Sequence, residues 1–217
     1  MRKIEKASFD RRRGVALVEF ALCAVFLIPL FFGAFVSGIS LVRAIQATQV
    51  SRDAGHMYVR HVDFSLDSNK DIVVRLAKGL NLTRDGGDGV VILTKIRAIT
   101  PDDCLAVGMA SGTCANSNQA VIVQRLYIGN RQVAQSAFGT PGASAYDPNS
   151  TRGEILPLEY LNNPSLRAQG FSTLLALQPA ELAFVSEAIF NLPDLAFVPD
   201  FGSGQTPVRR VYARTIF

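Results

Sequence analysis

The chain has 217 residues, of which 48% are hydrophobic and 18% charged, a composition that excludes a disordered protein and suffices for a folded core. Its formal net charge is +4, and this excess lies in residues 1–14, where six Lys and Arg side chains outnumber two acidic ones. The remaining residues carry 16 basic and 16 acidic side chains. Because a nucleic-acid-binding surface needs a concentrated basic face, we expect no nucleic acid among the partners.

A continuous apolar stretch follows the basic leader. Residues 14–42 read GVALVEFALCAVFLIPLFFGAFVSGISLV, and Glu19 is the one acidic side chain among these 29 residues. A helix of this length rises about 43 Å, which exceeds the roughly 30 Å of membrane hydrocarbon. The stretch therefore predicts a transmembrane helix over residues 15–42. It is longer than the apolar region of a cleaved signal peptide, and it lacks the polar face of a helix in a small soluble domain.

The flanks of this stretch predict its orientation. Arg11, Arg12 and Arg13 directly precede it, whereas the residues that follow it carry mixed charge. Basic residues remain on the cytoplasmic side, so we expect a single-pass inner-membrane protein with a cytoplasmic N-terminus. The C-terminal domain would then lie in the periplasm.

The start of the stretch has a distinctive order of residues. Basic side chains are followed by Gly14, four apolar residues beginning at Val15, then Glu19 and Phe20. This order resembles the cleavage region of type IV prepilins. Together with a later QVSRDAGHMYVR, the segment GVALVEFAL is similar to the TadE-like pseudopilins of the tight-adherence pilus machinery, and the resemblance covers residues 11–62.

The resemblance implies a role for each of these residues. A prepilin peptidase would cut between Gly14 and Val15, and Glu19 with Phe20 would take part in pairing with neighbouring subunits. It also implies other pilin-like subunits and the pilus assembly machinery as partners, insertion in the inner membrane, incorporation in a pilus, and no cofactor.

Two interpretations of Glu19 are open. A carboxylate within a membrane span is costly, by about 2.5 to 3.5 kcal/mol for Asp, and needs a partner or water. Glu19 lies six residues after Arg13 and can reach the hydrated interface. Alternatively, cleavage creates an ammonium group on Val15, four residues away, which attracts the carboxylate strongly in a low dielectric.

Beyond the span, the pattern predicts that the helix continues over residues 43–62. Its thin apolar stripe is formed by Ala47, Val50, Ala54, Met57 and His61. His56 and His61 are about 140° apart around such a helix and do not face one metal ion. We therefore expect a surface or edge position for both, and no metal site.

Residues 63–217 predict an exported α+β domain whose antiparallel sheet packs against the long N-terminal helix. A short helix begins with a capping box at Ser68–Asp71 and continues on one apolar face made by Ile72, Val73, Leu76, Ala77 and Leu80. We expect a mobile loop over residues 136–154, and irregular cover or a short helix over 166–177. Runs rich in β-branched residues predict strands at residues 90–99, 120–128, 183–190 and 208–217.

Two cysteines, Cys104 and Cys114, lie in the connection between the first two predicted strands. An exported domain is exposed to an oxidising compartment, which favours a disulfide over two free thiols. A zinc site would lack further ligands. The third cysteine, Cys23, is expected to be a small packing residue of the span.

No pattern of catalytic residues is evident. The carboxylates of the exported domain are scattered, and Asp102 and Asp103 lie at a turn, where they favour backbone capping. We therefore expect a non-enzymatic pilin-like assembly component. Its domains are a cleaved leader (1–14), a transmembrane helix (15–42), a helix extension (43–62) and an exported domain (63–217). The alternatives are an uncleaved, membrane-anchored periplasmic adaptor and a membrane-tethered enzyme.

Overall fold

The computed structural model describes the backbone of residues 2–110, 113–192 and 209–217, and the side chains of 15–110, 113–192 and 210–217. The chain divides into two compact units. The first contains helix α1 (Arg2–Val59) as far as Val42, and the second begins at Arg43 and contains all the other described elements.

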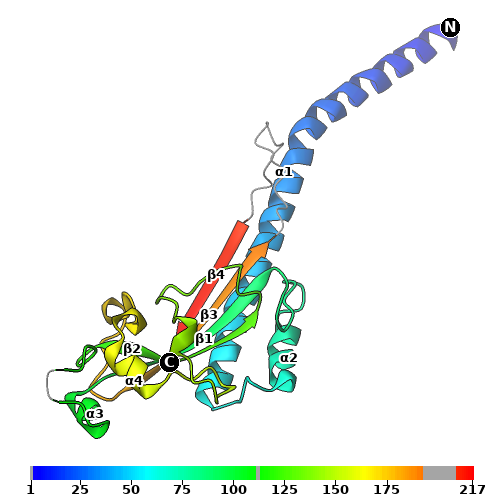
Figure 1. Cartoon of the computed structure of the whole chain (residues 1–217). Helices are drawn as coiled ribbons and strands as arrows, with labels where there is room; N and C mark the ends of the chain where they lie inside the picture. Colours follow the sequence, from blue (N-terminus) through cyan, green and yellow to red (C-terminus); the bar gives the residue numbers. More distant parts are fainter. Residues whose placement is uncertain (1, 111–112, 193–208) are drawn as a thin grey trace. The chain divides into compact units, whose positions relative to one another are not determined.

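The part of α1 in the second unit packs on a β-sheet through small residues (Figure 1). Its buried residues are Ala47, Val50, Ser51, Ala54, Gly55 and Tyr58. Short side chains let the helix backbone approach the strands, and the Ser51 hydroxyl donates a hydrogen bond of 2.9 Å to the Ser186 carbonyl. The predicted stripe is confirmed for Ala47, Val50 and Ala54, whereas His61 lies beyond the end of α1 and is exposed.

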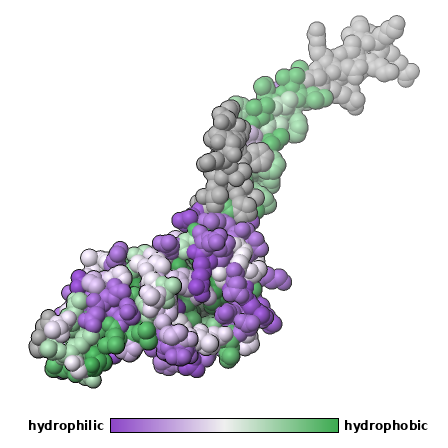
Figure 2. Space-filling view, in the orientation of Figure 1, coloured by the Kyte–Doolittle hydropathy of each residue, from purple (hydrophilic) through white to green (hydrophobic). Residues whose placement is uncertain are grey.

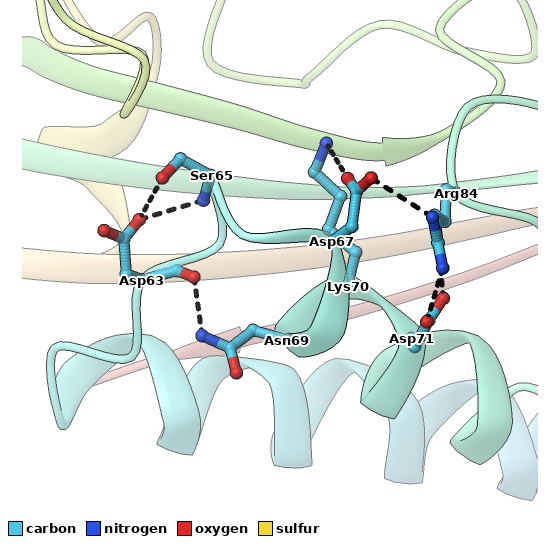
Figure 3. Close-up of polar contacts among 7 residues, drawn as sticks. All are labelled: Asp63, Ser65, Asp67, Asn69, Lys70, Asp71 and Arg84. Atoms are coloured by element: carbon cyan, nitrogen blue, oxygen red, sulfur yellow. Dashed lines mark hydrogen bonds and ion pairs between the residues drawn. The ribbon is translucent and has the colours of Figure 1, made fainter.

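The turn after α1 leads to helix α2 (Asp67–Leu76), which does not begin with the predicted capping box. The N-cap residue is Leu66, and no side chain caps the helix. Instead, Asp63 accepts hydrogen bonds from the backbone and hydroxyl of Ser65, and Asn69 donates to the Asp63 carbonyl (Figure 3). The capping prediction was wrong because an Asx turn centred on Asp63, three residues before the N-cap, organises this end of the helix.

The apolar face of α2 is narrower than predicted. Val73 is buried in the helix, and Ala77 and Leu80 are buried just after it, but the side chains of Ile72 and Leu76 are 44% and 38% exposed. Val73, Ala77 and Leu80 join the core formed with α1 and the sheet, and Val74 packs against it while partly buried.

The four strands form one antiparallel sheet, as the sequence predicted. They are β1 (Gly89–Ala98), β2 (Ala120–Gly129), β3 (Leu182–Leu192) and β4 (Arg209–Ile216), in the spatial order β2-β1-β3-β4. The β1–β2 register shifts between Lys95 and Ile96, where a bulge interrupts the ladder. Helices α1 and α2 pack on one face of this antiparallel sheet, so the architecture is α+β.

The two faces of the sheet have different cover. One face carries Val91, Leu93, Ala188 and Phe190 and packs against α1 and α2. The other is covered by irregular chain, which includes helix α4 (Pro157–Asn162) and the 3-10 turns η1 (Ala143–Ala145), η2 (Pro164–Leu166) and η3 (Phe171–Thr173). Residues 136–154 are part of this cover. They differ from the expected mobile loop, because Phe138 and Ala145 are buried against the sheet.

Candidate functional site

The exposed apolar surface of α1 is the most unusual feature of the first unit. From Val15 to Ile45, large apolar side chains point outward, and Phe20 is 74% exposed. In Figure 2, apolar colour predominates on the part of this helix that grey atoms neither form nor cover. Among the described residues, one helix is long and apolar enough to cross a membrane, and it is this one. A surface of this kind requires lipid or other apolar helices around it.

The residues singled out by sequence lie at the start of this surface. Gly14, Val15, Glu19 and Phe20 are all within α1. Val15 and Glu19 are four residues apart and therefore lie on the same side of the helix, one turn from each other. Glu19 is exposed, and no ion pair joins it to any side chain that the structure describes. Its carboxylate is therefore accessible to a partner group.

Within the second unit, the C-terminal residue Phe217 contacts α1. The sequence did not suggest this contact. The Phe217 ring lies 4.6 Å from the His56 ring, and Phe217 exchanges two backbone hydrogen bonds with Phe184. His61 lies 6.2 Å from the Phe184 ring. Both histidines are exposed and sit beside aromatic rings, and the described residues contain no group of three metal-ligating side chains.

A disulfide closes the connection between β1 and β2. Cys104 lies in the short helix α3 (Pro101–Ala106) and is bonded to Cys114, and both are buried. Thr100 and Asp103 form a capping box at the start of α3, so Asp103 has the backbone-capping role expected of an acidic residue at this turn. Cys23 is a free, exposed thiol on α1.

Two buried charges hold the irregular cover to the sheet. Glu187 on β3 accepts hydrogen bonds from the Ser136 hydroxyl, from the Ala137 amide at 3.1 Å and from the Tyr212 hydroxyl at 2.8 Å. Burial, reinforced by the nearby Glu187 carboxylate, raises the pKa of Tyr212. Arg125 on β2 donates to the Gly139 carbonyl at 2.9 Å. Both charges contact residues 136–139, so they fix this segment.

Sequence reasoning missed this pair of charges. Glu187 is a charged residue in the middle of the apolar strand LAFVSEAIF, and Arg125 interrupts AVIVQRLYI in the same way. The sequence contains one signal for these sites, a charged residue in the centre of an apolar strand. Charged side chains are rarely buried without partners, so such a residue indicates a buried polar contact.

Comparison with known proteins gives one match, in the N-terminal region. Residues 14–56 match a family model described as TadE-like protein. The matched segment begins at Gly14, runs through the exposed apolar surface and ends where α1 packs on the sheet beside Gly55. The search of curated proteins and the search of solved structures found no match.

Proposed function

We propose that this protein is a non-enzymatic, pilin-like assembly component of a tight-adherence pilus or a related secretion system. The observation that carries the proposal is the position of the TadE-like segment, residues 14–56, on a helix whose N-terminal part exposes a continuous apolar surface. Pilin-like proteins generally act by assembly through such helices rather than by catalysis. The buried charges of Arg125 and Glu187 hold the irregular cover to the sheet. This structural role is compatible with a non-enzymatic function.

In the proposed topology, α1 spans the inner membrane once. The basic leader stays in the cytoplasm, and the unit that begins at Arg43 lies in the periplasm. The buried Cys104–Cys114 disulfide supports this orientation, because such bonds persist in an oxidising compartment. The partners would be a prepilin peptidase, other pilin-like subunits and the pilus assembly machinery.

Processing by the peptidase is the first point to test. Intact mass is measured for the chain produced with and without a prepilin peptidase, and we expect the processed form to begin at Val15. Gly14→Leu should block cleavage, because a side chain there obstructs close approach of the peptidase to the backbone. Gly33→Leu, on the same helix, is the control and should be processed. A chain that keeps Met1 or Arg2 in every case would instead indicate the uncleaved, membrane-anchored adaptor.

The role of Glu19 is the second point. If Glu19 pairs with the Val15 ammonium after cleavage, Glu19→Gln leaves a buried positive charge without its counterion, at a cost of about 3 to 5 kcal/mol. Insertion and processing should persist, whereas co-purification with other pilin-like subunits and surface piliation should be lost. Asp53→Asn is the matched control, since Asp53 is exposed on α1 beyond the span. Normal piliation by Glu19→Gln would leave Glu19 as a carboxylate hydrated at the interface.

A further inference from the structure

The two edge strands of the sheet, β2 and β4, differ in what lies beside them. At β2, the Arg125 amide donates to the Gly153 carbonyl at 2.8 Å. The Ile155 amide donates to the Val123 carbonyl of the same strand at 3.0 Å. At β4, the opposite edge of the sheet in Figure 1, no described residue forms a backbone hydrogen bond on the side away from β3. The chain therefore covers one edge of its sheet with its own backbone and leaves the other without such cover among the described residues.

The hydrogen-bond pattern shows which backbone groups form this open edge of β4. Phe217, the residue after the strand, exchanges both backbone hydrogen bonds with Phe184. Such pairs alternate in an antiparallel ladder, so the N–H and C=O groups of every second residue of β4 point away from β3. These residues are Arg210, Tyr212, Arg214 and Ile216. The strand contains no proline, and its pairing with β3 has no register shift, so it lacks two features that commonly prevent the addition of a strand.

The side chains at these positions give the edge a positive charge. Arg210 and Arg214 are exposed, and Tyr212 between them is 46% exposed. The three residues alternate along β4 and lie on one face, with the arginine Cα atoms about 13 Å apart. Arg210 donates to the Asn191 side chain at 3.3 Å, and the Arg214 guanidinium lies 5.2 Å from the centre of the Phe138 ring. Neither arginine forms an ion pair with a side chain that the structure describes, so both charges are available to a partner.

These charges discriminate between the strands that could be added. Two copies of β4 side by side would bring the arginines of both copies onto one face, and in the register centred on Tyr212 each Arg210 would lie opposite an Arg214. Like charges directly opposite each other destabilise a sheet. A strand with two carboxylates four residues apart would instead place one carboxylate opposite each arginine, and such pairs are stabilising. The edge therefore favours an acidic strand over a second copy of β4.

We propose that the open edge of β4 binds an extended acidic segment of a partner polypeptide, which joins the sheet as a fifth strand antiparallel to β4. Backbone hydrogen bonds to the outward-pointing groups of β4 supply the affinity, as in other cases of strand addition. Ion pairs with Arg210 and Arg214 supply the selectivity. The edge belongs to the second unit, whereas the proposed assembly function rests on the apolar helix of the first, so this proposal does not depend on that function.

The test measures the binding of short labelled peptides to the full-length chain in micelles of a neutral detergent, by fluorescence anisotropy at low ionic strength. The probe TETVTET carries two glutamates four residues apart, and TKTVTKT is its basic counterpart. One N-methylated form of the probe blocks the amides of both glutamates and of the valine, which face β4 in the proposed register. A second form blocks three of the intervening threonine amides. We expect the first form to bind at least about tenfold more weakly than the probe, and the second to bind nearly as well.

Two substitutions test the contribution of charge. Arg210→Gln and Arg214→Gln should each weaken the binding of TETVTET about twofold to fivefold, the range for an exposed ion pair. Arg75→Gln is the control for net charge, since Arg75 is exposed on α2, and it should bind like wild type. Amide hydrogen exchange of the same full-length chain, read by mass spectrometry, should show slower exchange in β4 when the probe is bound.

The outcomes separate strand addition from other kinds of binding. Binding of TETVTET that depends on the amides facing β4 and on both arginines, with protection of β4, supports the proposal. Equal weakening by the two N-methylated forms would indicate a charge contact without strand addition and would overturn it. Tighter binding of TKTVTKT, or equal affinity of wild type and both arginine variants, would overturn the acidic partner. Tighter binding of a peptide with the sequence of residues 209–216 would identify a second copy of the chain as the partner instead. Absence of binding would overturn the site, and the peptide comparisons decide this on the wild-type chain even if a variant fails to fold.

Discussion

Gly55 is the position where a minimal change tests how α1 is held. A Cβ atom added there would lie 2.4 Å from a carbon of the Phe217 ring and 3.1 Å from the Ser186 Cβ. Carbon atoms in contact are normally about 3.5 to 4.0 Å apart, so the ring would have to move by at least about 1 Å. The ring is held by its contact with the tilted His56 ring and by the backbone hydrogen bonds between Phe217 and Phe184.

Two opposing terms set the size of the effect of Gly55→Ala. Alanine favours a helix interior over glycine by about 0.8 to 1.0 kcal/mol, whereas overpacking at a tight contact costs about 1 to 3 kcal/mol. The net expectation is a loss of about 1 kcal/mol in the free energy of unfolding of the second unit. In a Phe217→Ala background most of the clash disappears. The same substitution should then be neutral or stabilising, which gives a coupling of about 1 to 2 kcal/mol between the two positions.

The measurement is a double-mutant cycle by guanidinium unfolding of the full chain in detergent. Tyrosine fluorescence reports the transition, since the chain has five Tyr and no Trp. Gly33→Ala is the matched control on the same helix, because an added Cβ at Gly33 meets nothing within 4 Å in the part of the chain that the structure describes. If Gly55→Ala stabilises the wild-type chain, or if the coupling with Phe217→Ala is within about 0.5 kcal/mol of zero, the contact does not hold the helix as argued.

Three further predictions concern the second unit. Replacing Cys104 and Cys114 by Ser should lower the free energy of unfolding by about 2 to 3 kcal/mol, the loop-closure effect for a sequence separation of 10, and denaturation with and without reductant measures it. Hydrogen bonds from Ser65 hold the pKa of Asp63 below its ordinary value. The ionised carboxylate therefore adds to the free energy of unfolding above about pH 4, and this stabilisation is lost as the pH falls through the lowered pKa. Asp63→Asn should therefore reduce the dependence of the free energy of unfolding on pH below about pH 4. An unchanged dependence would count against the turn at Asp63. Burial raises the pKa of Tyr146 to about 12, so its neutral phenol favours the fold below pH 10 and that contribution is lost as the pH rises through the raised value. Tyr146→Phe should remove one late step from an ultraviolet titration, and a titration with the same late steps as wild type would contradict this.

The regular elements were predictable because their residue patterns are local. β-branched runs predicted the strands with limits within a few residues of those observed. The apolar stretch and its extension predicted α1 and its end near Val59, but the helix begins at Arg2, within the leader, and not at Val15. The start of α2 was missed because two competing local motifs overlap there. A Ser–Asp capping spacing is present at Ser68, but Asp63 and Ser65 form a turn that starts the helix earlier, at Asp67. Sequence spacing alone does not reveal which motif is used.

The irregular cover was less predictable, since its order comes from contacts distant in the sequence. Residues 136–139 resemble an exposed turn, yet they bind Arg125 and Glu187, which lie on different strands. The sequence separation between Ala137 and Glu187 is 50 residues, and no local pattern encodes such a bond.

Helix α1 uses the same residue type for two different purposes along its length. An added Cβ at Gly33 or Gly38 would meet nothing within 4 Å among the residues that the structure describes. Gly55 faces Phe217 and Ser186 so closely that only glycine fits without a shift of the ring. Small residues in a membrane helix allow other helices to approach, whereas Gly55 allows the sheet of its own chain to approach. As far as the described residues extend, Gly33 and Gly38 therefore leave room for another helix to approach closely. In the proposed function, pilin-like subunits would supply such helices, whereas Gly55 serves the packing of α1 on the sheet of its own chain.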